Sequence, residues 1–223
     1  METSEHTVEL FSGPKLFSSL AAVVGYSTFT VDRNGFSEPN LVADVRSLSP
    51  SVVPARPLLL WSAPPDAAFN ASDRDAHWDP YGTPLTAVAE EAIETFRAAL
   101  TLTTGLQPKW WFIENPYGPL RNFTLMAGFN RGHPTRNRIT IDHADYGDYP
   151  HFRTDIWTNA FWWHPRSEAV ARTARRPADA PVQVVPLAGR RLPPAAIAEM
   201  LDQLDAYRRA ADKPAALLPK LDG

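Results

Sequence analysis

Short apolar runs alternate with stretches of helical periodicity through the first half of the chain. The runs are rich in β-branched and aromatic residues, which favour strands. We expect strands at residues 8–11, 27–31, 41–45, 57–61 and 110–113. Apolar positions at helical spacing predict helices at 15–24 and 84–103. Strands that alternate with helices predict an α/β fold, with a mostly parallel sheet and helices on both faces.

The second half of the chain has a weaker pattern. It predicts two strands, a loop and a last amphipathic helix, at residues 139–141, 155–158, 142–152 and 193–208. An arginine-rich and proline-rich segment at 166–192 precedes that helix. No internal repeat divides the sequence, so we expect a single domain over residues 1–223, with its core at about 8–165.

The composition excludes several kinds of chemistry. The 223 residues include no cysteine, which removes disulfides, thiolate metal sites and cysteine nucleophiles. No run reaches the roughly 18 apolar residues of a membrane span, and residues 1–7 lack the pattern of a secretion signal, so we expect a cytoplasmic protein with no membrane association. The net charge of −3 argues against purely electrostatic binding of nucleic acid. Residues 118–141 nevertheless hold four arginines and no acid, which indicates either a nucleic-acid contact or a solvated face.

The first strand runs directly into a glycine turn at Gly13 and then into a helix. Asp32 follows Gly13 by 19 residues (32 − 13), a spacing that suits an acid holding the ribose hydroxyls of a nucleoside cofactor. Asp44 follows another strand, where it is placed to accept a hydrogen bond from an adenine amine. The alternative is an ordinary strand, turn and helix of any α/β protein. Pro14-Lys15 stands where a dinucleotide-binding fingerprint has its second glycine. Proline lacks the backbone N–H that would donate a hydrogen bond to a pyrophosphate. A cofactor without phosphates, S-adenosylmethionine, therefore fits better.

Two further motifs follow strand ends, WSAPPDAAF at 61–69 and FIENPYGPLR at 112–121. Together with VELFSG at 8–13 and TDIWTN at 154–159, they resemble the DNA (cytosine-5) methyltransferases, in particular a compact phage-type branch. Members of this branch carry F-S-G, P-P-C-x-x-F, E-N-P-x-G-x-L-R and T-x-x-W-T-N in the same order. The resemblance spans about residues 8–207 and implies the Rossmann-like fold of S-adenosylmethionine-dependent methyltransferases.

The resemblance also implies roles for individual residues. Those implied in cofactor binding are Phe11, Ser12 and Gly13 at the methionine part, Asp32 at the ribose, Asp44 at the adenine, and Pro64. Glu114 would hold the ring nitrogen of a flipped-out cytosine as a protonated acid, and an ion pair with a neighbouring arginine is the alternative. Contacts to nucleic acid, with DNA expected first, are implied for Asn115, Arg121, Arg136 and Arg138.

The chain departs from the family at the catalytic position, because Asp66 stands where the family has its cysteine. Methylation of a pyrimidine carbon requires a nucleophile to add to the ring first, and a carboxylate is a weaker nucleophile than a thiolate. The ordinary cytosine-5 reaction is therefore not expected. Methylation of an exocyclic amine remains open, with Asp66 as acceptor or base and Phe69 stacking on the base. Enzymes of that kind place the polar residue before Pro-Pro, however, where this chain has Ala63.

Two functions remain open, one enzymatic and one not. The first is an S-adenosylmethionine-dependent methyltransferase that acts on a flipped-out nucleobase, with Asp66 and Glu114 as its catalytic residues. The second is a catalytically inactive homologue that serves as a cofactor-binding or nucleic-acid-binding accessory protein. No long segment for reading the major groove is present, so sequence specificity would come from a homodimer or a partner subunit. Acids and histidines at 142–151 are spread through an aromatic loop, so no metal is expected.

Overall fold

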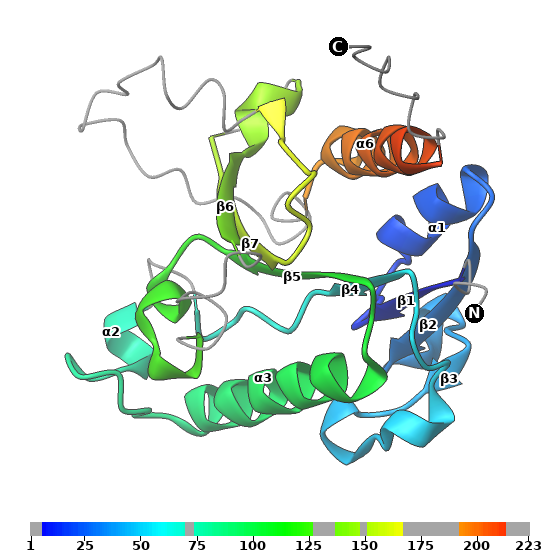
Figure 1. The fold of residues 1–223 in the computed structure, drawn as a ribbon. Helices are drawn as coiled ribbons and strands as arrows, with labels where there is room; N and C mark the ends of the chain where they lie inside the picture. The colour runs from blue at the N-terminus through cyan, green and yellow to red at the C-terminus, as the bar shows by residue number, and fades with distance from the viewer. Residues whose placement is uncertain (1–5, 70–73, 127–136, 148–150, 167–191, 213–223) are drawn as a thin grey trace, which may run out of the picture.

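The computed structural model describes residues 6–69, 74–126, 137–147, 151–166 and 192–212. They form one seven-stranded sheet in the order β3-β2-β1-β4-β5-β7-β6 (Figure 1). Its strands are β1 His6–Leu10, β2 Ser27–Asp32, β3 Leu41–Val42, β4 Leu59–Ser62, β5 Trp110–Pro116, β6 Asn137–Asp142 and β7 Arg153–Thr158. The helices considered below are α1 Leu16–Val23, α2 Arg74–His77, α3 Ala87–Leu106 and α6 Pro194–Ala211.

The strand directions confirm the expected fold class. The five strands from β3 to β5 pair in parallel, and β7 runs antiparallel between β5 and β6. This is the Rossmann-like arrangement of the methyltransferase fold, with a mostly parallel sheet and helices on both faces. Pairing with β7 continues β5 to Pro116, beyond the end expected at residue 113. Glu114 and Asn115 therefore lie on the sheet and not in the loop that follows it.

The helices cover the two faces of the sheet. Figure 1 shows α1 and α6 on one side and α3 on the other, and each side has its own apolar core. Because successive side chains of a strand point to opposite faces, Trp110 belongs to the first core and Trp111 to the second. Both indoles are at least nine-tenths buried. Neither ring is therefore an exposed platform for stacking bases.

Local hydrogen bonds explain where several elements begin and end. The Thr86 side chain caps α3, which begins at Ala87, three residues after the expected start. Asp44 caps a short 3-10 helix at Val45–Ser47, which ends β3 at Val42 and not at residue 45 as predicted. The loop expected at 142–152 likewise contains a 3-10 turn at His143–Tyr146.

The last helix, α6, docks against the body close to α1. Its apolar face packs into the first core, and the Tyr26 hydroxyl donates to Asp205 at 2.9 Å while accepting from Arg208 at 3.2 Å. Burial raises the pKa of the Tyr26 hydroxyl above its ordinary value. Across the described ranges, every helix is too short or too polar to span a lipid bilayer.

Candidate functional site

A cavity of about 560 Å³ opens at the carboxyl ends of β1, β4 and β5. Its walls come from the turn after β1, the loop after β4, the end of β5 and the beginning of α6. In a parallel α/β sheet this edge is where ligands bind. Of the residues predicted from the sequence, the cavity brings together Phe11, Ser12, Pro64, Asp66, Glu114 and Asn115.

Asp32 holds the turn between β1 and α1 in place. One of its carboxylate oxygens accepts from the Gly13 amide at 2.8 Å, and the other accepts from the Asn34 amide at 2.7 Å. The turn needs this support because Phe11 and Lys15 both have φ near 58°, a left-handed conformation that is unfavourable for residues with a side chain. Asp32 thus supports the turn that forms part of the cavity wall, although Asp32 itself does not line the cavity.

Glu9 lies in the middle of β1 and faces the cavity, although the sequence analysis did not select it. Its side chain is 5% exposed, and it accepts a hydrogen bond from the Ser18 amide in the first turn of α1 at 2.9 Å. It stabilises the helix N-terminus, where no neighbouring side chain caps the free amides. The signal that could have identified Glu9 is an acid inside an apolar central strand. Both faces of such a strand are buried, so an acidic side chain there needs a specific partner.

The cavity is acidic. Glu9, Asp66 and Glu114 contribute three carboxyl groups, and no lysine, arginine or histidine is among the described residues that line it. Its apolar floor includes Phe17 and Trp61, whose rings stack with centroids 5.3 Å apart and planes 11° from parallel. Carboxylates favour a positively charged ligand.

The loop that carries Asp66 is anchored by a buried aromatic cluster. The Phe69 amide donates to the Asp66 carbonyl oxygen at 2.8 Å, and the Trp78 indole donates to the Ala68 carbonyl oxygen. Phe69 is fully buried and stacks on Trp78 with ring centroids 5.5 Å apart. The sequence pattern left open that Phe69 stacks on a substrate base. The ring instead packs inside the protein, where it fixes the loop.

The end of β5 presents two polar side chains at the cavity. Glu114 Oε1 accepts from the Leu192 amide, just before α6, at 3.2 Å. Asn115 is 1% exposed, and within the described part of the chain neither its amide nitrogen nor its amide oxygen has a hydrogen-bond partner. The Ser12 hydroxyl is likewise buried without one. Because buried polar groups are nearly always paired, these atoms indicate a site that a ligand completes.

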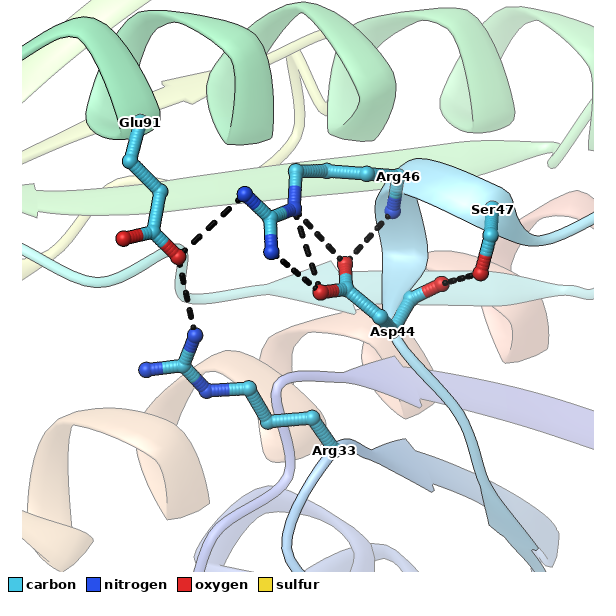
Figure 2. A network of polar contacts seen from close by, with 5 residues as sticks. All are labelled: Arg33, Asp44, Arg46, Ser47 and Glu91. Carbon is cyan, nitrogen blue, oxygen red and sulfur yellow. Dashed lines mark hydrogen bonds and ion pairs between the residues drawn. The ribbon is translucent and has the colours of Figure 1, made fainter.

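Asp44 belongs to a separate network on the surface (Figure 2). Its carboxylate accepts from the Arg46 guanidinium at 2.6 Å, and Glu91 pairs with both Arg46 at 3.3 Å and Arg33 at 3.1 Å. Hydrogen bonds from Arg46 hold the pKa of the Asp44 carboxyl below its usual value. Asp44 is not among the residues that line the cavity.

Arg121 is engaged by the protein itself. Its guanidinium pairs with the Asp155 carboxylate, with one N–O distance of 2.7 Å. The guanidinium carbon of Arg121 also lies over the Tyr117 ring, 3.7 Å from the ring centroid. Asp155 is fully buried and the Arg121 side chain is 17% exposed. The phosphate contact expected from the sequence competes with this charge pair. Arg138 is exposed on β6 and away from the cavity lining, and Arg136 lies outside the described residues.

The polar segment around 142–151 forms hydrogen bonds of its own where the structure describes it. His143 is buried and its Nε2 lies 2.8 Å from the Thr154 hydroxyl, while His151 Nδ1 lies 3.3 Å from the Asp142 carboxylate. Within the described ranges, no three histidine, aspartate or glutamate side chains are grouped closely enough to hold a metal ion.

No family model and no curated protein sequence matches the chain. Among solved structures, it is similar to a candidate DNA modification methyltransferase encoded within a prophage of E. coli, with 19% identity over 70% of this chain and 46% of the other, and a TM-score of 0.46. The S. pombe methyltransferase Dnmt2 is 12% identical over 69% of this chain and 49% of its own, with a TM-score of 0.44. TrmN from Thermus thermophilus is 13% identical over 69% and 43%, with a TM-score of 0.40. The chain thus spans a little under half the length of these three structures, and the fold assignment rests on its own sheet order.

Proposed function

We propose that this chain is an S-adenosylmethionine-dependent nucleobase methyltransferase, which acts on a flipped-out base of DNA through a site without cysteine. The proposal places it beside the compact phage-type cytosine-5 methyltransferases, as a single cytoplasmic domain that gains specificity from a second copy or a partner subunit. The observation that carries it is the cavity at the carboxyl ends of β1, β4 and β5, which has three carboxyl groups and no cationic side chain among its described lining residues.

The charge of the cavity suits this cofactor better than other nucleoside cofactors. S-adenosylmethionine carries a sulfonium and an ammonium group, both positive, whereas NAD, FAD and ATP carry phosphates that three carboxylates repel. The buried, unpartnered Ser12 hydroxyl gives the ligand a hydrogen-bonding group. These features support the fit of the cofactor at this edge of the sheet.

Each part of the cavity has an assigned role in the proposal. Phe11, Ser12 and Pro64 border the methionine part of the cofactor, and Glu9 stabilises its positive charge. Asp32 contacts the ribose and Asp44 contacts the adenine. The two oxygens of a carboxylate can accept about four hydrogen bonds, so each acid can accept from the cofactor in addition to its protein partners. When bound, the cofactor supplies an electrophilic methyl group.

The remaining residues are assigned to the base and the DNA. Glu114 and Asn115, at the end of β5, bind the polar edge of the base, and Asp66 faces it from the loop after β4. Exposed Arg138, together with Arg136, is assigned to the phosphates. Arg121 reaches the DNA phosphates only if its ion pair with Asp155 opens, so we assign Arg121 the smallest share of the DNA binding.

Calorimetric titration of the full chain tests the cofactor assignment. We expect S-adenosylmethionine to bind, and ATP and NAD not to bind. Glu9→Gln keeps an oxygen for the Ser18 amide and removes one charge, so S-adenosylmethionine affinity falls about tenfold, the equivalent of about 1.4 kcal/mol. Glu90→Gln, a matched change at an exposed position of α3, leaves the affinity unchanged. Binding of ATP in preference to S-adenosylmethionine would contradict the assignment.

A second candidate function is a binding protein that has lost catalysis, and the aspartate at the catalytic position favours it. Mass spectrometry of nucleosides from DNA incubated with the protein and S-adenosylmethionine separates the two candidates. A methylated nucleoside supports the enzyme. Cofactor binding without any methylated nucleoside supports the binding protein. Asp66→Cys then tests how much of the ancestral site remains, because an intact site should gain cytosine-5 methylation.

A further inference from the structure

We propose that the methyl acceptor is the exocyclic amine of a cytosine or adenine base, with the Asp66 carboxylate taking the amine proton. This inference rests on the proposed function and names the atom that is methylated. It follows from which groups the cavity holds and how firmly they are placed.

The cavity offers no activated nucleophile for attack on a base ring. The chain contains no cysteine, and Ser12 is the one residue with a hydroxyl side chain among the described lining residues. A serine hydroxyl needs a neighbouring base such as an imidazole to become nucleophilic, and no histidine is among those residues. Carbon methylation of a pyrimidine requires that attack, so the structure does not support it.

The cavity does offer what an amine acceptor needs. The nitrogen lone pair forms the new N–C bond as the S–C bond of the sulfonium breaks, which leaves a neutral thioether. The nitrogen then carries one proton too many, and this proton passes to the Asp66 carboxylate. No covalent adduct with the protein is formed, and no other reactant is required. General-base assistance of this kind typically contributes about 10²–10⁴-fold to a rate.

Asn115 provides the recognition that such a base requires. Its buried amide has a free donor and a free acceptor at the cavity edge. Cytosine and adenine both present an amine donor beside an unprotonated ring nitrogen, and a carboxamide pairs with both atoms at once. Uracil and hypoxanthine have a carbonyl oxygen beside a ring N–H, which the amide matches when it is turned over. The preference for an amine therefore comes from the Asp66 carboxylate, which accepts a hydrogen bond from an amine and repels a carbonyl oxygen.

Asp66 is held in place firmly enough to serve as a base. Its loop is tied down by the Phe69 amide, which donates to the Asp66 carbonyl, and by the Trp78 indole, which donates to the Ala68 carbonyl. Trp78 and Phe69 stack at 5.5 Å and are both at most 2% exposed. Trp78 is thus a positioning residue, and preorganisation of this kind is what proton transfer depends on.

Two measurements on the full chain test the inference. The first is anisotropy binding of short single-stranded oligonucleotides that carry cytosine or uracil, and adenine or hypoxanthine, at one position. We expect about tenfold tighter binding of one amine-bearing base, and weaker binding of all four bases in Asn115→Ala. The second is mass spectrometry of nucleosides after incubation with S-adenosylmethionine, in which N4-methylcytosine or N6-methyladenine identifies the acceptor.

Variants at position 66 assign the proton transfer. At saturating S-adenosylmethionine, Asp66→Asn is expected to lower the yield of N-methylated nucleoside at least about 100-fold, well beyond the roughly tenfold loss of affinity that removal of one cavity charge brings. Asp66→Glu, which keeps a carboxylate, is expected to retain part of the activity. The matched control is Asp75→Asn on α2, whose side chain is 94% exposed, and it should change neither quantity.

The outcomes separate this inference from the proposed function. 5-Methylcytosine made by the unaltered chain, or N-methylation that survives in Asp66→Asn, overturns the inference and leaves the proposed function standing. Cofactor binding with no methylated nucleoside and no preference for an amine also overturns the inference. A chain that does not bind S-adenosylmethionine overturns the proposed function itself.

Discussion

Two groups of acids lie near the carboxyl edge of the sheet, and their surroundings differ. Asp44 and Glu91 face arginines at 2.6–3.3 Å, so their charges are neutralised within the protein (Figure 2). Glu9, Asp66 and Glu114 face a cavity that no cationic side chain lines within the described residues. Asp44 and Asp66 both come shortly after a strand in the sequence, so position along the chain does not separate these two acids. The difference is that arginines face the first group, whereas the second group lines a cavity whose described charged residues are all acidic.

Arg121 and Asp155 show the same principle for a buried pair. Arg121 follows the motif that carries Glu114 and was expected to bind phosphate, yet Asp155, 34 residues later, neutralises it. Thr140 donates to the same carboxylate at 2.7 Å. The pair ties the segment after β5 to β7 and β6, which places Glu114 and Asn115 at the cavity.

The largest expected effect comes from Arg121→Met. The change leaves the fully buried Asp155 charge without its partner, so the free energy of unfolding should fall by about 3–5 kcal/mol. Urea denaturation measures it. Arg138→Met, on an exposed position of β6, is the control and should change stability by less than about 0.5 kcal/mol. A fully stable Arg121→Met that loses only DNA affinity would return Arg121 to the group of ligand-binding charges.

Trp78→Phe should have the next largest effect. It keeps an aromatic ring on Phe69 but removes the hydrogen bond to the Ala68 carbonyl, at an expected cost of about 1–3 kcal/mol. The denaturation midpoint reports this change. Tyr81→Phe removes a hydroxyl from a side chain on a residue that is 95% exposed and should have no measurable effect. Equal stability of the two variants would show that the loop with Asp66 does not depend on Trp78.

Matched glutamate changes test the comparison directly. Glu91→Gln removes a charge that two arginines neutralise, so stability should fall by about 0.5 kcal/mol. Glu114→Gln relieves crowding of like charges and keeps an acceptor for the Leu192 amide, so stability should rise by up to about 1 kcal/mol. Thermal melts of both variants give the sign. The same sign for both would mean that the arginines around Glu91 do not distinguish it from the acids of the cavity.

The smallest effect is the pH dependence of the Asp44 pair. Because hydrogen bonds from Arg46 lower the pKa of Asp44, its contribution to stability is present above about pH 4 and is lost as the pH falls through the lowered pKa. Asp44→Asn should therefore be about 0.2–0.5 kcal/mol less stable than the unaltered chain at pH 7. The two should converge near pH 2 and also in 1 M salt, which screens the pair. A difference that persists at pH 2 would contradict an electrostatic origin.

The fold and part of the site could be predicted from the sequence. Strand periodicity located every strand to within a few residues, and ordered motifs placed Phe11, Ser12, Asp66 and Glu114 on one edge. The burial of Phe69 was not predictable, because its partners Trp78, Phe96 and Phe123 follow at separations that carry no local signal. The pairing of Arg121 with Asp155 was also missed, since the two residues are 34 positions apart and meet only in the folded chain.

The sequence by itself determined the α/β class, the order of the motifs along the sheet edge and the absence of any thiol, because periodicity, motif order and composition are properties of the linear chain. Only the tertiary structure decided which acids keep their charge for a ligand. Electrostatic interactions weaken over a few ångströms, so the state of each carboxylate depends on neighbours that the fold brings from distant positions. Asp155 acquired Arg121 in this way, while Glu9, Asp66 and Glu114 came to line one cavity.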